Sequence, residues 1–146
     1  MEIVAIRHKL HCHFPGNFAP ECPHCCASST SPPAIENTEN LLFSCPPKLE
    51  VWRHTHTFYL SPRLAHFACE EYLALLQFRL DIDRSSHELF PKLSVFQVFS
   101  CIQYAIWSAH YRHIFHHSPF NPSQITNSIH RELVHLNSQL SLETLI

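Results

Sequence analysis

The chain has 146 residues, of which 45% are hydrophobic and 15% charged, which suits one folded domain with a modest core. A formal net charge of −2 excludes a strong electrostatic field for nucleic acid, although the 14 histidines would turn the surface basic below pH ~6.5. The single glycine argues against a β-rich fold with many tight turns and against a glycine-rich phosphate loop.

The cysteines are expected to be reduced thiols or metal ligands. No apolar run approaches the roughly 20 residues that span a membrane, and the N-terminal sequence lacks the long apolar core of a signal peptide. We therefore expect an intracellular protein, cytoplasmic or nuclear, without a membrane partner. In that setting seven cysteines indicate thiols or metal ligands rather than disulfides.

Residues 1–46 form a loop-rich region that contains most of the cysteines, with a polar, proline-containing loop expected over 28–40. Its main feature is the Cys-x-x-Cys turn of Cys22 and Cys25, a spacing that places two thiolates on one metal ion. Cys45 can supply a third thiolate from across the loop. We therefore predict a tetrahedral site for one zinc ion. The alternative is three unrelated buried thiols, and a thioredoxin-like pair is disfavoured because no βαβ pattern surrounds the turn.

The fourth ligand of this site is left open by the sequence. Cys26 could replace Cys25 through a shift of one residue, and His13 could fold back from upstream. The predicted metal ligands are therefore Cys22, Cys25 and Cys45, with Cys26 or His13 as the fourth. Four other residues are further alternatives: His11, Cys12, His24 and Glu39.

Residues 47–146 are expected to form a bundle of about four helices, packed as one domain with the cysteine-rich region. The double proline of Pro46 and Pro47 suits the start of a first helix that reaches residue 60. Its expected apolar face is Leu49, Trp52, His56 and Leu60. A second helix is expected over 61–80, capped by Ser61 and Pro62. Its expected apolar face is Leu64, Ala68, Leu75 and Phe78, flanked by Phe67 and Leu76.

The third and fourth helices have the clearest patterns. Ser94 is expected to cap a helix over 94–115, and Asn121 with Pro122 to cap a last helix. The apolar stripe of the third is Val95, Val98, Phe99, Ile102, Ala105, Ile106 and Ala109. The stripe of the last is Ile125, Ile129, Leu133, Leu136 and Leu140.

Histidines gather near the end of the third helix. His113 and His117 have the i, i+4 spacing of a helical metal pair, with His110 one turn earlier. No glutamate or cysteine follows nearby to complete a site. We therefore interpret the three as surface residues that face the negative end of the helix dipole, and His54-x-His56 as a helix surface feature too.

The segment from Cys22 to Trp52 resembles the zinc-binding domain that follows the polymerase region in reverse transcriptases of non-LTR retrotransposons. The family pattern is Cys-x-x-Cys, an acidic-Thr pair, His-Leu-Phe-x-x-Cys-Pro and then a tryptophan. Here the matching parts are Cys22 and Cys25, the region Glu36-Asn37-Thr38, the run Leu41-Leu42-Phe43-Ser44-Cys45-Pro46, and Trp52. The resemblance covers residues 5–130 or so, and its most specific part is 20–52.

The family's histidine falls at position 40, where this chain has Asn40, a poor zinc ligand. The resemblance implies an accessory module that binds and positions RNA or DNA for a reverse transcriptase core. It implies no catalysis by the chain itself, because an Asp-Asp pair for two-metal nucleotidyl transfer is missing. For nucleic acid, Arg7 and Lys9 form a basic cluster with nearby histidines, and we expect weak binding there. The alternatives are a metal-free helical interaction domain, a degenerate remnant and, as a minor reading, a thiol-dependent enzyme.

Overall fold

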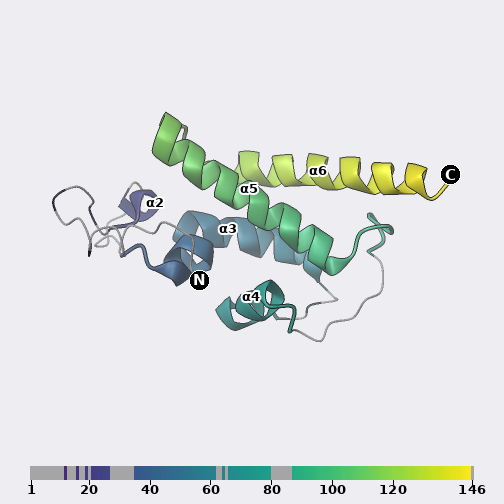
Figure 1. The fold of residues 1–146 in the computed structure, drawn as a ribbon, viewed down its shortest axis with the longest axis horizontal. Helices are drawn as coiled ribbons and strands as arrows, with labels where there is room; N and C mark the ends of the chain where they lie inside the picture. The colour runs from purple at the N-terminus through teal and green to yellow at the C-terminus, as the bar shows by residue number, and fades with distance from the viewer. Residues whose placement is uncertain are drawn as a thin grey trace. The chain divides into compact units, whose positions relative to one another are not determined.

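The computed structural model describes residues 12, 16, 19, 21–26, 35–61, 64, 66–79 and 87–145. The chain divides into two compact units, Met1–Glu50 and Val51–Ile146. The described residues are mainly helical, as predicted (Figure 1). The β-structure among them is an isolated antiparallel bridge between Glu21 and Ile35. Within this described part, no helix combines the length and the apolar character needed to span a bilayer.

The N-terminal unit contains a short helix α2 (Pro23–Cys26), a π-helical turn η1 (Asn40–Ser44) and the start of helix α3 (Pro46–Thr55). The loop predicted over 28–40 is wrong at its end, because Thr38 and Glu39 are already helical. The cause is Asn37, whose side-chain Oδ1 accepts a hydrogen bond from the Asn40 N–H at 2.8 Å and caps the turn. Residues 28–34 lie outside the described residues.

The C-terminal unit continues from α3 into a π-helical turn η2 (His56–Leu60). Three helices follow: α4 (Cys69–Leu76), α5 (Val95–His116) and α6 (Pro122–Glu143). The two longest, α5 and α6, confirm their predicted starts and caps. The Ser94 side chain accepts a hydrogen bond from the Gln97 N–H at 3.2 Å, and the Asn121 side chain accepts one from the Gln124 N–H at 3.3 Å. Helices α5 and α6 pack against each other as a hairpin (Figure 1).

Trp52 lies at the centre of the core of the C-terminal unit and is fully buried. Its ring centroid is 5.1 Å from that of Tyr72 and 5.5 Å from that of Phe99. The predicted face of the first helix is therefore right at Trp52 and Leu60, which are buried. It is wrong at Leu49 and His56, which are only half-buried. The ring Nε2 atom of His56 lies 2.7 Å from the Leu64 carbonyl oxygen.

The second predicted helix begins later than expected. Ser61 forms a turn, and α4 starts only at Cys69. The glutamates of the first helical turn explain the shift, because the Glu71 side chain accepts a hydrogen bond from the Ala68 N–H at 3.0 Å and its charge suits the helix N-terminus. Phe78, expected on the apolar face, lies past the end of α4 with a left-handed φ of 54° and is 75% exposed.

Candidate metal centre

Three cysteines of the N-terminal unit bring their sulfur atoms together in a buried cluster. Cys22 precedes α2, Cys25 lies within α2, and Cys45 lies between η1 and α3. The Sγ atom of Cys45 is 3.7 Å from that of Cys22 and 3.6 Å from that of Cys25. All three sulfur atoms lie within 4.8 Å of one another. The structure thus unites the three thiols that the sequence pattern grouped.

The spacing of this cluster matches the geometry of a tetrahedral zinc–thiolate centre. Zinc–sulfur bonds of about 2.3 Å at tetrahedral angles place the sulfur atoms about 3.8 Å apart. The three cysteines are free thiols, whereas disulfide sulfurs would lie about 2.05 Å apart. Cys22 and Cys45 are completely buried, and Cys25 is 6% exposed. This group could hold a metal ion such as zinc.

Local structure explains why the three sulfur atoms converge. Cys22 directly precedes α2, and Cys25 lies three residues later within this helix. At this spacing the two side chains point to the same side of the helical turn. The bridge between Glu21 and Ile35 joins the chain entering α2 to the chain that leads toward η1. The Cys45 N–H donates to the Asn40 carbonyl oxygen at 3.3 Å, which ends η1 and fixes Cys45 just before α3.

Asn40 lies beside the cluster, at the position where the resembled family has its histidine. Its side-chain Nδ2 atom is 3.5 Å from the Cys25 sulfur, and Asn40 is only 5% exposed. Its Oδ1 atom is buried and has no hydrogen-bond partner among the described residues. A half-turn of the amide would exchange the two atoms and present the oxygen to the cluster. Position 40 is thus well placed for a fourth metal ligand, but the asparagine at this position is a weak ligand for zinc.

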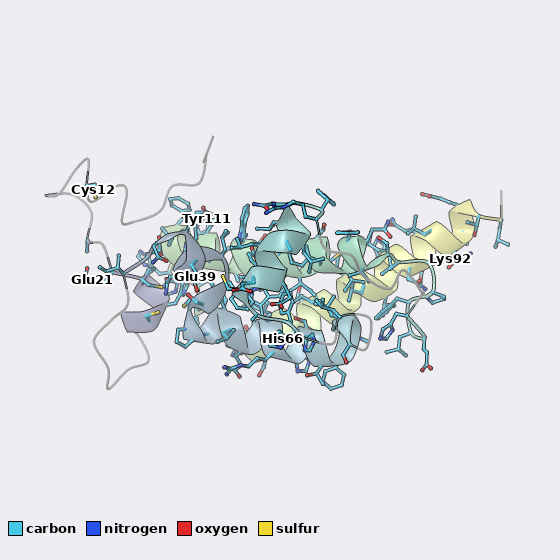
Figure 2. All side chains as sticks on the ribbon, turned by 90° about the horizontal axis from the view of Figure 1, so that it is seen from below. Cys12, Glu21, Glu39, His66, Lys92 and Tyr111 are labelled. Carbon is cyan, nitrogen blue, oxygen red and sulfur yellow. The ribbon has the colours of Figure 1, made fainter. Side chains whose placement is uncertain are left out.

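The other candidates for the fourth ligand are placed differently. Cys12 and Glu39, both labelled in Figure 2, are exposed, whereas His24 inside the Cys-x-x-Cys turn is 3% exposed. Cys26 is the last residue of α2, but its side chain lies outside the described residues, as do His11 and His13. Cys22, Cys25 and Cys45 form the one group of potential metal ligands found in the described part of the chain.

Hydrogen bonding within the cluster separates the pKa values of its thiols. The side-chain hydrogen bond between Cys22 and Cys45 is the largest cause that lowers the pKa of Cys22 to about 5. The same hydrogen bond, followed by burial, raises the pKa of Cys45. Burial is the largest cause of the raised pKa of Cys25. At neutral pH the metal-free cluster therefore holds one thiolate and two thiols, because three negative charges so close together need a cation.

Two buried charged residues near the cluster were missed by sequence reasoning. Lys48 is completely buried on the first turns of α3, and Glu36 is 1% exposed beside the bridge to Glu21. The Lys48 Nζ atom donates to the Leu41 carbonyl oxygen of η1 at 2.6 Å. The available signal was the position of Lys48 in helical register with Val51 and Thr55, which puts a lysine on a buried helix face.

The histidines at the end of α5 form no metal group among the described residues. His110 is only 1% exposed, so its interpretation as a surface residue is wrong; it lies one turn after Ile106 on the buried face of α5. A ring nitrogen of His113 lies 3.0 Å from the Ser118 carbonyl oxygen, and His117 ends the helix with a left-handed φ of 55°. These contacts belong to the helix terminus.

Comparisons with known protein families, with curated proteins and with solved structures find no match to this chain. The resemblance to the retrotransposon zinc-binding domain therefore stays a prediction that rests on the residues quoted for it.

Proposed function

We propose that the N-terminal unit binds one zinc ion through Cys22, Cys25 and Cys45, and that the ion has a structural role. The observation that carries this proposal is the buried cluster with sulfur separations near those of a tetrahedral centre. Thiolates favour zinc over hard cations such as magnesium and calcium. Burial favours a structural ion over a catalytic one, because a catalytic zinc keeps a position open to substrate.

The fourth position is assigned to the side chain of Asn40, the nearest described alternative, with Cys26 and His13 as the other two. An amide oxygen binds zinc weakly, so this centre is weaker than one with four thiolate or imidazole ligands. It would still stabilise the N-terminal unit, because it joins α2 to the segment between η1 and α3.

Zinc binding is expected to be one ion per chain and steeply dependent on pH. At a pH above the pKa of about 5 for Cys22 and below the raised pKa values of Cys25 and Cys45, zinc binding must release one proton from each of these two thiols. Affinity should therefore rise about hundredfold per pH unit, and fall equally as pH decreases. Chelator competition at pH 6.5, 7.0 and 7.5 measures this slope. Absence of zinc binding at all three values would favour a metal-free helical interaction domain or a degenerate remnant.

The resemblance extends the proposal to an accessory nucleic-acid-binding module of a retrotransposon reverse transcriptase, without catalysis of its own. The position of Asn40 supports this extension. The residue that aligns with the family's histidine has its side chain against the cysteine cluster, where a fourth ligand belongs. Alignment and geometry thus agree at the one position where the chain departs from the family pattern.

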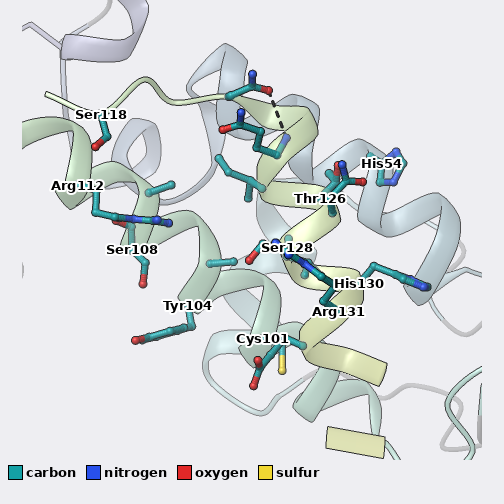
Figure 3. A pocket seen from close by; sticks show the side chains of 18 of the residues that line it. His54, Cys101, Tyr104, Ser108, Arg112, Ser118, Thr126, Ser128, His130 and Arg131 are labelled. Carbon is teal, nitrogen blue, oxygen red and sulfur yellow. Dashed lines mark hydrogen bonds between the residues drawn. The ribbon is translucent and has the colours of Figure 1, made fainter. Parts of the chain in front are cut away.

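A groove in the C-terminal unit favours single-stranded nucleic acid as the partner. It has a volume of about 1910 Å³ and follows the hairpin of α5 and α6 (Figure 3). Arg112, Ser108 and Tyr104 line it from α5, and Ser128 and Arg131 line it from α6. The charged and potentially charged residues that line it are His54, Arg112, His116, His130, Arg131 and one acidic residue, Glu132.

The groove combines cations with aromatic rings, the two elements with which proteins hold unpaired strands. Tyr104 and Phe115 are 75% and 70% exposed, and Phe115 stacks on Tyr111 with ring centroids 6.1 Å apart. Such rings can stack on bases, and the two arginines can contact phosphates. The chain as a whole has a net charge of −2, yet the groove is lined by two arginines and only one carboxylate. This local excess of positive charge favours a polyanion as the ligand.

Replacement of both Arg112 and Arg131 by alanine is expected to weaken binding of a labelled oligonucleotide. Each lost phosphate contact on a single strand reduces the slope of log affinity against log salt by about 0.7, so the double variant should lose about 1.4. Fluorescence anisotropy at several salt concentrations measures the slope. Arg79→Ala is the matched control, because Arg79 is exposed and does not line the groove. A wild-type chain that binds no oligonucleotide at low salt, or a double variant with an unchanged slope, contradicts this assignment.

A further inference from the structure

Lys48 places a positive charge in the interior of the N-terminal unit. The residue is completely buried, and its Nζ atom donates to the Leu41 carbonyl oxygen at 2.6 Å. An ammonium group has three donors and is strongly hydrated in water, so burying it costs several kcal/mol unless anions lie close by. One carbonyl oxygen carries only a partial negative charge. The buried lysine therefore calls for a nearby anionic group.

The groups that interact electrostatically with Lys48 are mainly those of the cysteine cluster. Burial lowers the pKa of Lys48, and negative charge on Cys45 and Cys22 opposes this most strongly, followed by Glu36 and then Cys25. Lys48 also lies three residues after Cys45, which directly precedes α3 and accepts a hydrogen bond from the Leu49 N–H at 2.8 Å, so both residues belong to the start of this helix. Three potential thiolates and one buried carboxyl group are thus the negative charges that favour the charged form of Lys48.

We propose that Lys48 is the counter-ion of the metal centre, a positioning residue whose charge balances the centre when zinc is bound. This inference rests on the proposed zinc function. A divalent ion with three thiolates carries a net charge of −1, and the ammonium group of Lys48 brings the sum of these five charged groups to zero. The hydrogen bond to Leu41 holds the charge there, and it also ties α3 to η1, which carries Asn40. Lys48 thus favours a centre of three thiolates with a neutral fourth ligand.

The test compares zinc affinities of substituted full-length chains by chelator competition. Lys48→Gln removes the charge but retains a donor for the Leu41 carbonyl, whereas Lys48→Met removes both. Lys48→Arg retains the charge. We expect both neutral variants to bind zinc at least tenfold more weakly than wild type, and the arginine variant to remain within threefold. Because Lys48→Met also loses a hydrogen bond, Lys48→Gln is the decisive variant if Lys48→Met fails to fold.

Glu36→Gln identifies the anion that Lys48 balances. If the cluster is that anion, the glutamine variant retains zinc affinity within threefold of wild type. If Glu36 is the true partner, Glu36→Gln weakens zinc binding as much as Lys48→Gln does, and the proposal is overturned. It is also overturned if Lys48→Gln binds zinc as tightly as wild type. A wild-type chain that binds no zinc contradicts the proposed function itself, and the counter-ion role with it.

The rise in melting temperature on zinc binding gives a second test. This rise would not differ between wild type and Lys48→Gln if Lys48 had only a structural role. Zinc should raise the melting temperature of wild type more than that of Lys48→Gln, because the charge of Lys48 contributes only when the thiolates are ionised around the metal. If Lys48 serves only to hold η1 by its hydrogen bond, the zinc-induced rise is the same in both chains. That equality counts against the proposal even where both chains fold well.

Discussion

Replacement of Cys45 by serine is expected to leave the chain largely without zinc at concentrations that are just sufficient to saturate wild type. Cys45 has the central place in the cluster, with its sulfur 3.7 Å from that of Cys22 and 3.6 Å from that of Cys25. It also joins the metal to the segment between η1 and α3. A structural zinc ion contributes about 10–16 kcal/mol over four ligands, so one lost thiolate should weaken affinity by about 10²–10³-fold. Chelator competition measures the loss.

The matched control for this change is Cys101→Ser. Cys101 is a half-buried free cysteine on α5, remote in sequence from the cluster, and its thiol belongs to no group of potential ligands among the described residues. Cys101→Ser makes the same chemical change without removing a proposed zinc ligand, so the zinc affinity of this variant should equal that of wild type. Equal zinc affinity of Cys45→Ser and wild type would show that the cluster is not the metal site.

Replacement of Asn40 by histidine is expected to strengthen zinc binding at least tenfold, equivalent to about 1.4 kcal/mol. Imidazole nitrogen is a common zinc ligand, with bonds of about 2.0–2.1 Å, whereas an amide oxygen is a poor one. The Asn40 side chain already lies 3.5 Å from the Cys25 sulfur in a buried position. The change should also raise the melting temperature of the zinc-loaded protein. Chelator competition and thermal melting test both effects.

Asn40→Ala shows which residue fills the fourth position in the natural chain. If the Asn40 amide is the ligand, the alanine variant binds zinc more weakly than wild type, and the three chains rank His, Asn, Ala in order of affinity. If Cys26 or His13 is the ligand, alanine at position 40 leaves affinity unchanged. In that case histidine brings no gain either, because the coordination sphere is already complete.

The sequence predicted those parts of the structure that depend on local signals. Ser94 with Gln97 and Asn121 with Pro122 mark the starts of α5 and α6, because capping requires only residues within one turn. Likewise, the Cys-x-x-Cys turn and Cys45 predicted the cysteine cluster. The start of α4 was misplaced because two local signals competed. Ser61 and Pro62 suggested one cap, and the Glu71 side chain formed another.

The burial of polar residues could not be predicted from sequence patterns, because it depends on neighbours that are distant in sequence. Lys48 is polar by type, yet it is completely buried, with its Nζ atom donating to the Leu41 carbonyl oxygen. His110 was interpreted as a surface residue from its place near a helix end, and the packing of α5 buries it. Asn40 was recognised only as a departure from a family pattern. Its contact with Cys25 required the folded chain.

In the proposed metal centre, three thiolates of this chain hold a zinc ion. X-ray absorption at the zinc edge, recorded on the full chain purified under reducing conditions, tests that claim directly. We expect one zinc ion per chain, with three sulfur neighbours at about 2.3 Å and one oxygen or nitrogen neighbour at about 2.0–2.2 Å. A zinc ion surrounded by oxygen and nitrogen alone would contradict the claim. So would a zinc-free protein in which Cys22, Cys25 and Cys45 all react freely with an alkylating reagent.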